Sequence, residues 1–179
     1  MGDTILVPVD FSDCSLDVAR RAGRAARERG AAVILLHVVE LPPTMSPDTL
    51  IEPEPDAAPI TALAYVRGAA EARMAAFAAL DEFAGLRVEA RVLRGIPAEV
   101  IVAEAERVDA TELFMGTHGR TGFAKLMNGS VAESVMDATK RPVTVVRSEH
   151  KASCEALSCA WCTSGALEAQ DRLWTEFDR

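Results

Sequence analysis

The sequence predicts a doubly wound α/β fold, and two observations support this prediction. Between residues 4 and 147, short apolar or β-branched runs alternate with Ala-rich stretches that have helical spacing. The first two runs are apolar on both faces, as expected for central strands of a parallel sheet that helices cover. Strands and helices that alternate in this way form a parallel sheet with helices on both faces.

The first strand–helix–strand unit occupies the N-terminal quarter of the chain. Residues 4–9 (TILVPV) and 32–39 (AVILLHVV) are the expected strands. Residues 12–29 between them carry apolar side chains at helical spacing, and Gly30 follows as a stop signal. A crossover between parallel strands of one sheet is expected to be right-handed.

A proline-rich segment follows the second strand. Residues 41–59 hold six of the nine prolines, at 42, 43, 47, 53, 55 and 59, together with four acidic residues. Proline lacks the N–H that helices and strand ladders require, so this segment predicts a loop. A lid over a site and a disordered insertion are its two alternative roles.

The alternation then resumes and completes the domain. We expect a helix over 60–83, a strand over 87–93, a helix from Pro97 to about Arg107, a strand over 112–115, a helix over 130–139 and a strand over 142–147. Pro97 suits the first turn of its helix. The five strands and four helices predict one domain over residues 1–148, followed by an extension over 149–179.

Composition limits the classes of partner and location. The net charge of -8 arises from 19 Lys and Arg against 27 Asp and Glu, and no basic cluster offsets it, so nucleic acid is not an expected partner. No apolar run approaches the ~18 residues of a membrane span, and the N-terminus lacks the basic region of a signal peptide. Only one of the four cysteines lies in the main body of the chain. We therefore expect a cytoplasmic protein.

A glycine-rich segment leaves the fourth strand and ends at a helix start. It contains glycines at 116, 119, 122 and 129, which permit tight turns and a close approach of phosphate to backbone amides. The following helix start attracts anions, and His118, Arg120 and Lys125 add positive charge. The spacing is neither that of a Walker A loop nor that of a GxGxxG dinucleotide site.

This segment, Gly116-x2-Gly119-x9-Gly129-Ser130, resembles the nucleotide loop of the universal stress protein family, ATP-binding type. Four further segments resemble the same family in the same order: Ile-Leu-Val-Pro-Val-Asp-Phe-Ser at 5–12, His-Val-Val at 37–39, Gly-x-Pro-Ala at 95–98 and Arg-Pro-Val-Thr-Val-Val at 141–146. The resemblance covers residues 1–148. It implies a five-stranded parallel sheet in the order 3-2-1-4-5, with the ligand beyond the carboxyl ends of strands one and four.

The resemblance also implies a set of nucleotide-binding residues. Pro8, Val9, Asp10 and Val38 are expected to border the adenosine, and Met115 and Gly116 to pass beneath it. Gly119, Gly129, Ser130 and Val131 are expected to hold the phosphates, assisted by His118 and Arg120. The expected ligand is ATP, or AMP or ADP, with Mg²⁺.

One residue of this set, Ser130, has a competing interpretation. Ser130 and Glu133 also form a capping box, which accounts for the serine without a ligand.

His118 and Asp10 are insufficient for a hydrolase, which needs a positioned second acid or base. We therefore expect no enzyme, or at most slow ATP hydrolysis. His37, inside an apolar strand, is expected to be a core histidine.

The last expected strand, Pro142–Arg147, lies at the sheet edge in the resembled fold. An uncovered edge invites pairing with another chain. Members of the family commonly dimerise through this strand about a two-fold axis, and an isologous contact is the commonest oligomer geometry. We therefore expect a homodimer.

The C-terminal extension carries a separate set of candidates. His150, Cys154, Cys159 and Cys162 are possible zinc ligands, an iron–sulfur loop or redox pair is an alternative, and simple packing of small side chains is another. Residues 164–179 predict an amphipathic helix that contains Trp174, which is expected to dock onto the domain, its dimer mate or an unknown protein. Cys14, at a helix start, is a reactive thiol or a buried structural one.

Three functions remain at this point. The first is a stress-response regulatory protein that binds an adenine nucleotide. The second is a non-catalytic dimeric interaction module, in which the glycine loop is structural. The third is a metal or thiol sensor that uses the C-terminal cysteines. Fold resemblance alone does not decide between them.

Overall fold

The apolar runs of the sequence form a parallel five-stranded sheet in a computed structural model of the chain, which describes residues 2–53, 57–116 and 131–146. The sheet strands are β1 (Thr4–Pro8), β2 (Ala32–Val39), β5 (Val88–Arg94), β6 (Glu112–Gly116) and β7 (Val143–Val146). Their spatial order is β5-β2-β1-β6-β7, and every neighbouring pair is parallel. This order confirms the predicted 3-2-1-4-5 sheet.

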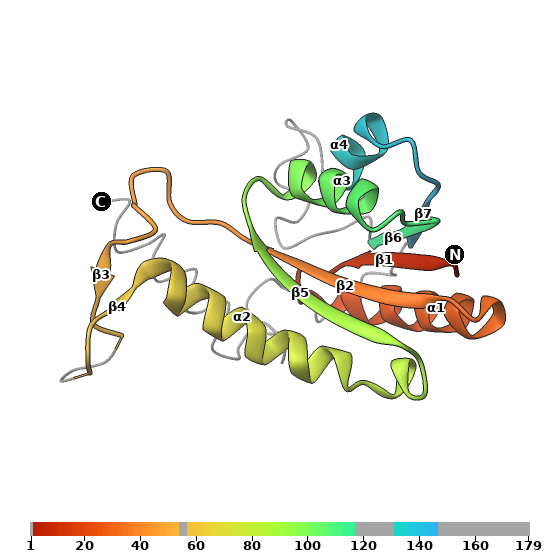
Figure 1. Cartoon of the computed structure of the whole chain (residues 1–179), viewed down its shortest axis with the longest axis horizontal. Coiled ribbons are helices and arrows are strands. Elements are labelled where there is room, and N and C mark those ends of the chain that lie inside the picture. Colours follow the sequence, from red (N-terminus) through yellow and green to blue (C-terminus); the bar gives the residue numbers. More distant parts are fainter. Residues whose placement is uncertain (1, 54–56, 117–130, 147–179) are drawn as a thin grey trace.

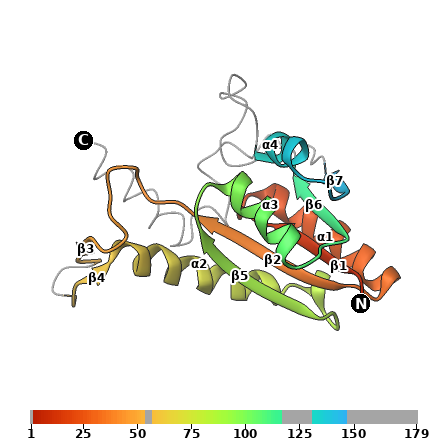
Figure 2. The ribbon, with the colours of Figure 1, turned by 45° about the horizontal axis from the view of Figure 1, so that its top comes forward.

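In the described part of the chain, four α-helices cover the two faces of the sheet (Figures 1 and 2). The helices are α1 (Asp13–Arg29), α2 (Ala62–Ala78), α3 (Pro97–Arg107) and α4 (Val131–Ala138), and a short 3-10 helix, η1 (Asp81–Phe83), joins α2 to β5. The pair α1 and α2 packs on one face, and the pair α3 and α4 packs on the other. In the described parts of the chain, no helix combines the length and apolar character that crossing a bilayer requires.

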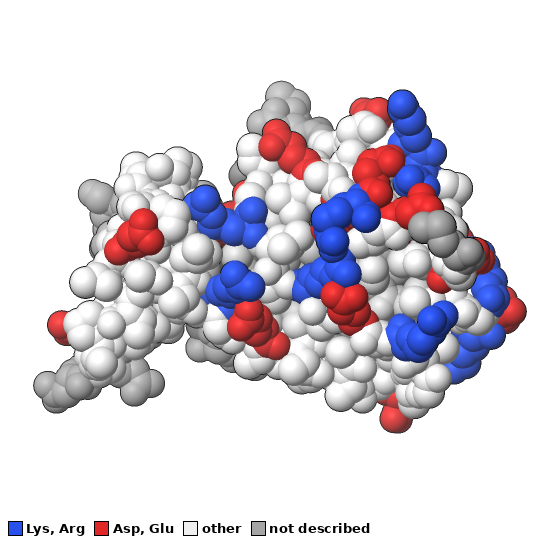
Figure 3. Space-filling view, in the orientation of Figure 1, with Lys and Arg blue, Asp and Glu red and all other residues white. Residues whose placement is uncertain are grey.

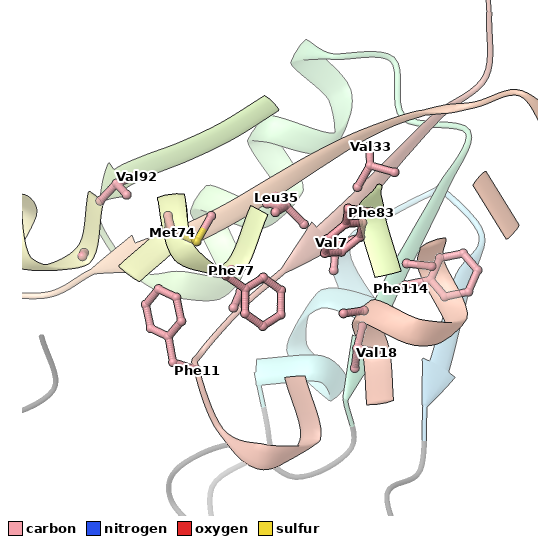
Figure 4. Close-up of a cluster of buried hydrophobic side chains, with 14 of the residues drawn as sticks. Val7, Phe11, Val18, Val33, Leu35, Met74, Phe77, Phe83, Val92 and Phe114 are labelled. Atoms are coloured by element: carbon pink, nitrogen blue, oxygen red, sulfur yellow. The ribbon is translucent and has the colours of Figure 1, made fainter. Parts of the chain in front are cut away.

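Successive residues of each central strand enter two different hydrophobic cores. In β1, Ile5 and Val7 point into the core beneath α1 and α2, whereas Leu6 points into the core beneath α3 and α4. Val33 and Leu35 of β2 line the first core in the same way. Figure 4 shows the first core, to which Val18 of α1 and Met74 and Phe77 of α2 contribute. Burial on both faces explains why these strands are apolar throughout.

The proline-rich segment corrects one expectation. It was predicted to hold no ladder, yet β3 (Leu50–Ile51) pairs antiparallel with β4 (Ile60–Thr61). The loop prediction is wrong at Leu50 and Ile51, which are not proline and keep their backbone N–H, and the helix prediction is wrong at Ile60 and Thr61. The hairpin lies away from the five-stranded sheet in Figure 1, and Leu50 is 67% exposed.

The helix after the hairpin is shorter than its predicted span of 60–83. It begins at Ala62, where the Thr61 side-chain oxygen accepts a hydrogen bond from the Ala64 N–H at 3.1 Å. It ends at Ala78, because Leu80 takes an extended conformation before η1. The other predicted helices and sheet strands agree with the structure to within one or two residues. The predicted extension over 149–179 lies outside the described residues.

Candidate functional site

The candidate site lies where β1 and β6 run side by side. Ile5 and Leu6 of β1 pair with Glu112 and Leu113 of β6. After β1 the chain enters α1 on one face of the sheet, whereas the helix that follows β6, α4, lies on the opposite face. Strands that send their connections to opposite faces leave a crevice beyond their carboxyl ends, which is where open α/β sheets bind ligands.

Asp10 follows β1 at the carboxyl end of the sheet, and the start of α1 holds its carboxylate. Asp10 Oδ1 accepts hydrogen bonds from the Ser12 N–H at 3.0 Å, from Ser12 Oγ at 2.6 Å and from Ser15 Oγ at 2.7 Å. Ser15 is buried. Ser12 is the N-cap of α1, where its side chain makes no capping bond to the helix, and its hydroxyl donates to Asp10. The position of Asp10 is thus tied to the first turn of the helix.

Phe11 has an unusual backbone conformation for a residue with a side chain. Its φ is +61°, in the left-handed region, and its ring is buried. The ring centroid lies 4.5 Å from that of His37, and the Arg73 guanidinium carbon lies 4.6 Å from the Phe11 centroid. The turn between β1 and α1 is therefore anchored by contacts from β2 and from α2.

His37 is the buried core residue that the sequence predicted. Its Nδ1 lies 2.7 Å from the Val9 carbonyl oxygen, and because a carbonyl only accepts, Nδ1 carries the proton. The Val9 N–H donates to the Leu36 carbonyl at 2.8 Å. Both backbone polar groups of Val9 are thus engaged within the protein, and its side chain is buried in the first core. Val9 therefore helps to fix the chain just before Asp10.

The other described residues of the predicted nucleotide set lie at or near the carboxyl ends of β1, β2 and β6. Val38 and Met115 pack against the second core, below α3 and α4. Pro8 ends β1 opposite Leu36, and Gly116 ends β6 opposite Val146. The predicted adenosine-side residues therefore lie at the carboxyl end of the sheet.

Of the predicted phosphate-side residues, only Val131 lies within the described part of the chain. His118, Gly119, Arg120, Gly129 and Ser130 lie outside the described residues. Their flanks are Gly116 at the end of β6 and Val131 at the start of α4, where the Val131 side chain is exposed. The segment 117–130 thus connects the carboxyl end of the central strand β6 to a helix N-terminus.

The predicted metal ligands cannot be placed in the same way. His150, Cys154, Cys159 and Cys162 all lie outside the described residues. Within residues 2–53, 57–116 and 131–146, no three His, Cys, Asp or Glu residues gather as a metal site.

Sequence reasoning missed Arg73 as part of this site. Arg73 occupies the buried face of α2 together with Val66, Ala70 and Phe77, at helical spacing. The signal was available in that periodicity, because an arginine at an otherwise apolar position of an amphipathic helix is either buried with a contact or at the rim of the core. Its contact with Phe11 depends on tertiary packing and could not be read from the chain.

The two edges of the sheet have different chemical character. The β5 edge carries Glu89, Arg91 and Arg94, and Figure 3 shows acidic and basic side chains interspersed on the face where β5 runs. The β7 edge has the sequence VTVV, and Val145 is 37% exposed there. Charged side chains oppose edge-to-edge pairing, whereas a short β-branched strand permits it.

Known proteins that are similar to this chain are universal stress proteins. The model of the universal stress protein family matches residues 1–147. Universal stress protein MJ0531 of Methanocaldococcus jannaschii is 33% identical over 147 residues, which are 82% of this chain and 83% of that protein. A solved universal stress protein in complex with cAMP is 26% identical, with a TM-score of 0.58, and the match covers 82% of this chain and 97% of the other.

A further solved structure, that of protein MJ0577 from the same organism, superposes with a TM-score of 0.63. The match covers 84% of this chain and 99% of MJ0577. At 24% identity, this likeness shows the fold alone.

Proposed function

Because this chain belongs to the universal stress protein family, we propose that it is a stress-response regulatory protein that binds an adenine nucleotide beyond β1 and β6. The observation that carries the proposal is the fixed carboxylate of Asp10 at that edge, held by Ser12 and Ser15. A carboxylate placed there can accept hydrogen bonds from ribose hydroxyls. The solved relative that contains cAMP, also an adenine nucleotide, supports this class of ligand.

The proposed ligand is ATP, or AMP or ADP, with Mg²⁺ when phosphates beyond the first are present. In this proposal Pro8, Val9, Asp10 and Val38 border the adenosine, and Met115 and Gly116 lie beneath it. The backbone of the glycine-rich segment at Gly119, Gly129 and Ser130 holds the phosphates, with Val131 at the helix start. Binding rather than turnover is the proposed role, with hydrolysis at most slow.

Calorimetric titration of the full chain with ATP and Mg²⁺ tests this proposal, with ADP, AMP and cAMP as competitors. We expect saturable binding near one site per chain. Gly119→Val and Gly129→Val should abolish binding while the protein stays folded, because the added side chains occupy phosphate space. Gly68→Val is a matched control, because a Cβ at Gly68 on α2 meets no atom within 4 Å.

The result that would overturn the proposal is equally specific. A folded, nucleotide-free wild-type protein that gives no heat with any of the four nucleotides would remove the nucleotide assignment. Wild-type affinity in a folded Gly119→Val or Gly129→Val protein would remove the phosphate role of the segment.

We also infer that two copies of the chain pair through β7, and the contrast between the sheet edges supports this inference. The β5 edge carries charges that discourage pairing, whereas β7 presents Val143, Thr144 and Val145. Val145→Lys should convert a dimer to a monomer in light scattering. Ala90→Lys, at an exposed position of β5, should leave the dimer intact. A wild-type monomer, or a Val145→Lys dimer, would contradict the inference.

A further inference from the structure

Helix α2 carries one charged side chain on its buried face. Arg73 is 6% exposed and lies among Ala70, Met74 and Phe77 on that face. Its guanidinium carbon lies 4.6 Å from the centre of the Phe11 ring. Figure 4 shows the Phe11 ring beside α2, near Met74 and Phe77. A desolvated guanidinium over an aromatic face forms a cation–π contact that is stronger than an exposed one.

Phe11 needs such contacts, because its backbone conformation is unfavourable on its own. A left-handed φ is unfavourable for an L-residue other than glycine, so the surroundings must hold it. Among the described residues, three charged or aromatic side chains lie against the ring: Arg73 from α2, His37 from β2 at 4.5 Å, and Phe77 from α2, edge-on at 6.3 Å. Two of these three contacts come from one helix.

The conformation of Phe11 bears directly on Asp10. Phe11 is the residue between Asp10 and Ser12, and both Ser12 and Ser15 donate hydrogen bonds to Asp10 Oδ1. The left-handed turn at Phe11 brings the start of α1 back toward the carboxylate of Asp10, two residues after the end of β1. If φ of Phe11 relaxed to a negative value, the serines and the carboxylate would no longer face each other.

We propose that Arg73 is a positioning residue for the nucleotide site: its cation–π contact holds Phe11 in the left-handed turn, and the turn in turn presents the Asp10 carboxylate. The inference rests on the proposed nucleotide-binding function. It makes α2, an element distant in sequence from the predicted nucleotide residues, part of the site's support. The charge of Arg73, and not only its bulk, carries the effect.

Three variants separate charge from bulk. Arg73→Met keeps an unbranched apolar side chain without the cation, Arg73→Lys keeps a cation, and Arg67→Met removes an exposed arginine of the same helix. ATP affinity should fall roughly thirtyfold in Arg73→Met, the equivalent of a desolvated cation–π contact. Arg73→Lys should recover most of that loss, and Arg67→Met should bind as the wild type does. Equal binding by Arg73→Met and Arg67→Met, or equal losses in Arg73→Met and Arg73→Lys, would overturn the proposal.

A second readout does not depend on nucleotide. The HN–Hα coupling and backbone chemical shifts of Phe11 report its φ in the ligand-free protein. They should move away from left-handed values in Arg73→Met and return in Arg73→Lys. If the wild type binds no nucleotide, the function proposed above fails, while these spectra still decide whether Arg73 sets the turn. Unchanged spectra in Arg73→Met would overturn that step.

Phe11→Leu keeps the test decisive if Arg73→Met does not fold. This variant removes the ring and leaves Arg73 in place, so a loss of ATP affinity of similar size is expected. A folded Phe11→Leu protein with wild-type affinity would overturn the proposal.

Discussion

Ser15 Oγ donates to Asp10 Oδ1 at 2.7 Å, so a buried residue in the first turn of α1 fixes the carboxylate at the end of the β1 segment. Helix α1 packs on the first core through residues further along its length, including Val18 and Ala22. One of the groups that position the carboxylate therefore belongs to a helix that the core itself holds in place.

Removal of this hydroxyl should weaken both folding and nucleotide binding. We expect Ser15→Ala to lower the free energy of unfolding by about 1 kcal/mol, the typical net value of one hydrogen bond, and to lower ATP affinity several-fold. Denaturant unfolding and calorimetric titration measure the two quantities. Ser134→Ala, at an exposed position of α4, serves as the control and should change neither appreciably. Unchanged affinity in Ser15→Ala would show that Asp10 does not need this anchor.

The same glycine-to-alanine change should have opposite effects in α1 and α2. A Cβ at Gly23 would lie 2.2 Å from the Glu82 backbone carbonyl oxygen, whereas a Cβ at Gly68 meets nothing within 4 Å. Gly23→Ala should therefore destabilise the protein by about 1–3 kcal/mol through overpacking. Gly68→Ala should stabilise it by about 0.5–1 kcal/mol, because glycine inside a helix costs backbone entropy. Thermal unfolding of the two variants tests both signs, and a shared sign would contradict the packing of α1 against η1.

An ion-pair cluster around the buried carboxylate of Glu104 joins β5 to α3. Glu104 is 4% exposed, and it accepts hydrogen bonds from Arg107 at 2.7 and 2.8 Å and from the Arg91 guanidinium. Glu104→Ala removes these charged hydrogen bonds while Arg91 keeps Glu89 as a partner, so we expect a loss of about 1.5–3 kcal/mol. Glu71→Ala, which breaks an exposed pair with Arg67 on α2, should cost less than about 0.5 kcal/mol. Similar losses in the two variants, measured by denaturant unfolding, would place Glu104 in a solvated environment.

Stability should depend on pH through Glu106. A hydrogen bond from Arg141 at 3.0 Å, together with the charge of the guanidinium, holds the pKa of Glu106 below its ordinary value. A carboxyl whose pKa is lower in the folded state stabilises the protein above its unfolded pKa, which is about 4.3 for glutamate. That contribution is lost as pH falls through the lowered, folded-state pKa.

Glu106→Gln should therefore melt at a lower temperature than the wild type at pH 7, and the difference should close toward pH 3. Arg141→Gln should show a gap of the same sign that also narrows at low pH. A melting difference that stays constant across this pH range would show that the pair does not contribute through charge.

The course of the chain could be predicted because its signals are local. The β2 run AVILLHVV is apolar on both faces, and Gly30 ends α1 in the left-handed conformation with its N–H donating to the Ala26 carbonyl. The pairing of β3 with β4 could not be predicted, because two runs of two residues each, separated by a proline-rich stretch of sequence, leave too short a pattern to recognise. The early end of α2 likewise depends on how residues 79–87 return to β5.

The candidate site was predictable in part. Asp10 follows an apolar strand in a recognisable segment, so its place at the sheet edge was expected. The left-handed φ of Phe11 was not expected, because this conformation is usually adopted by glycine or asparagine and seldom by phenylalanine. Arg73 lies on a different element, and its burial depends on side chains brought together only by the fold.

The two-sided burial of the central strands has a consequence for how the sheet assembles. In most half-buried sheets, a one-residue slip of a strand would turn its apolar side chains to water, so solvent itself rejects the error. Here a slipped β1 would exchange Leu6 with Ile5 or Val7, and apolar groups would still meet apolar groups on both sides. The correct register of β1 must then be selected by the shapes of the side chains that pack together and by the fixed lengths of the connecting segments. A shortened or lengthened connection should accordingly yield misaligned, slowly interconverting sheets before it yields an unfolded chain.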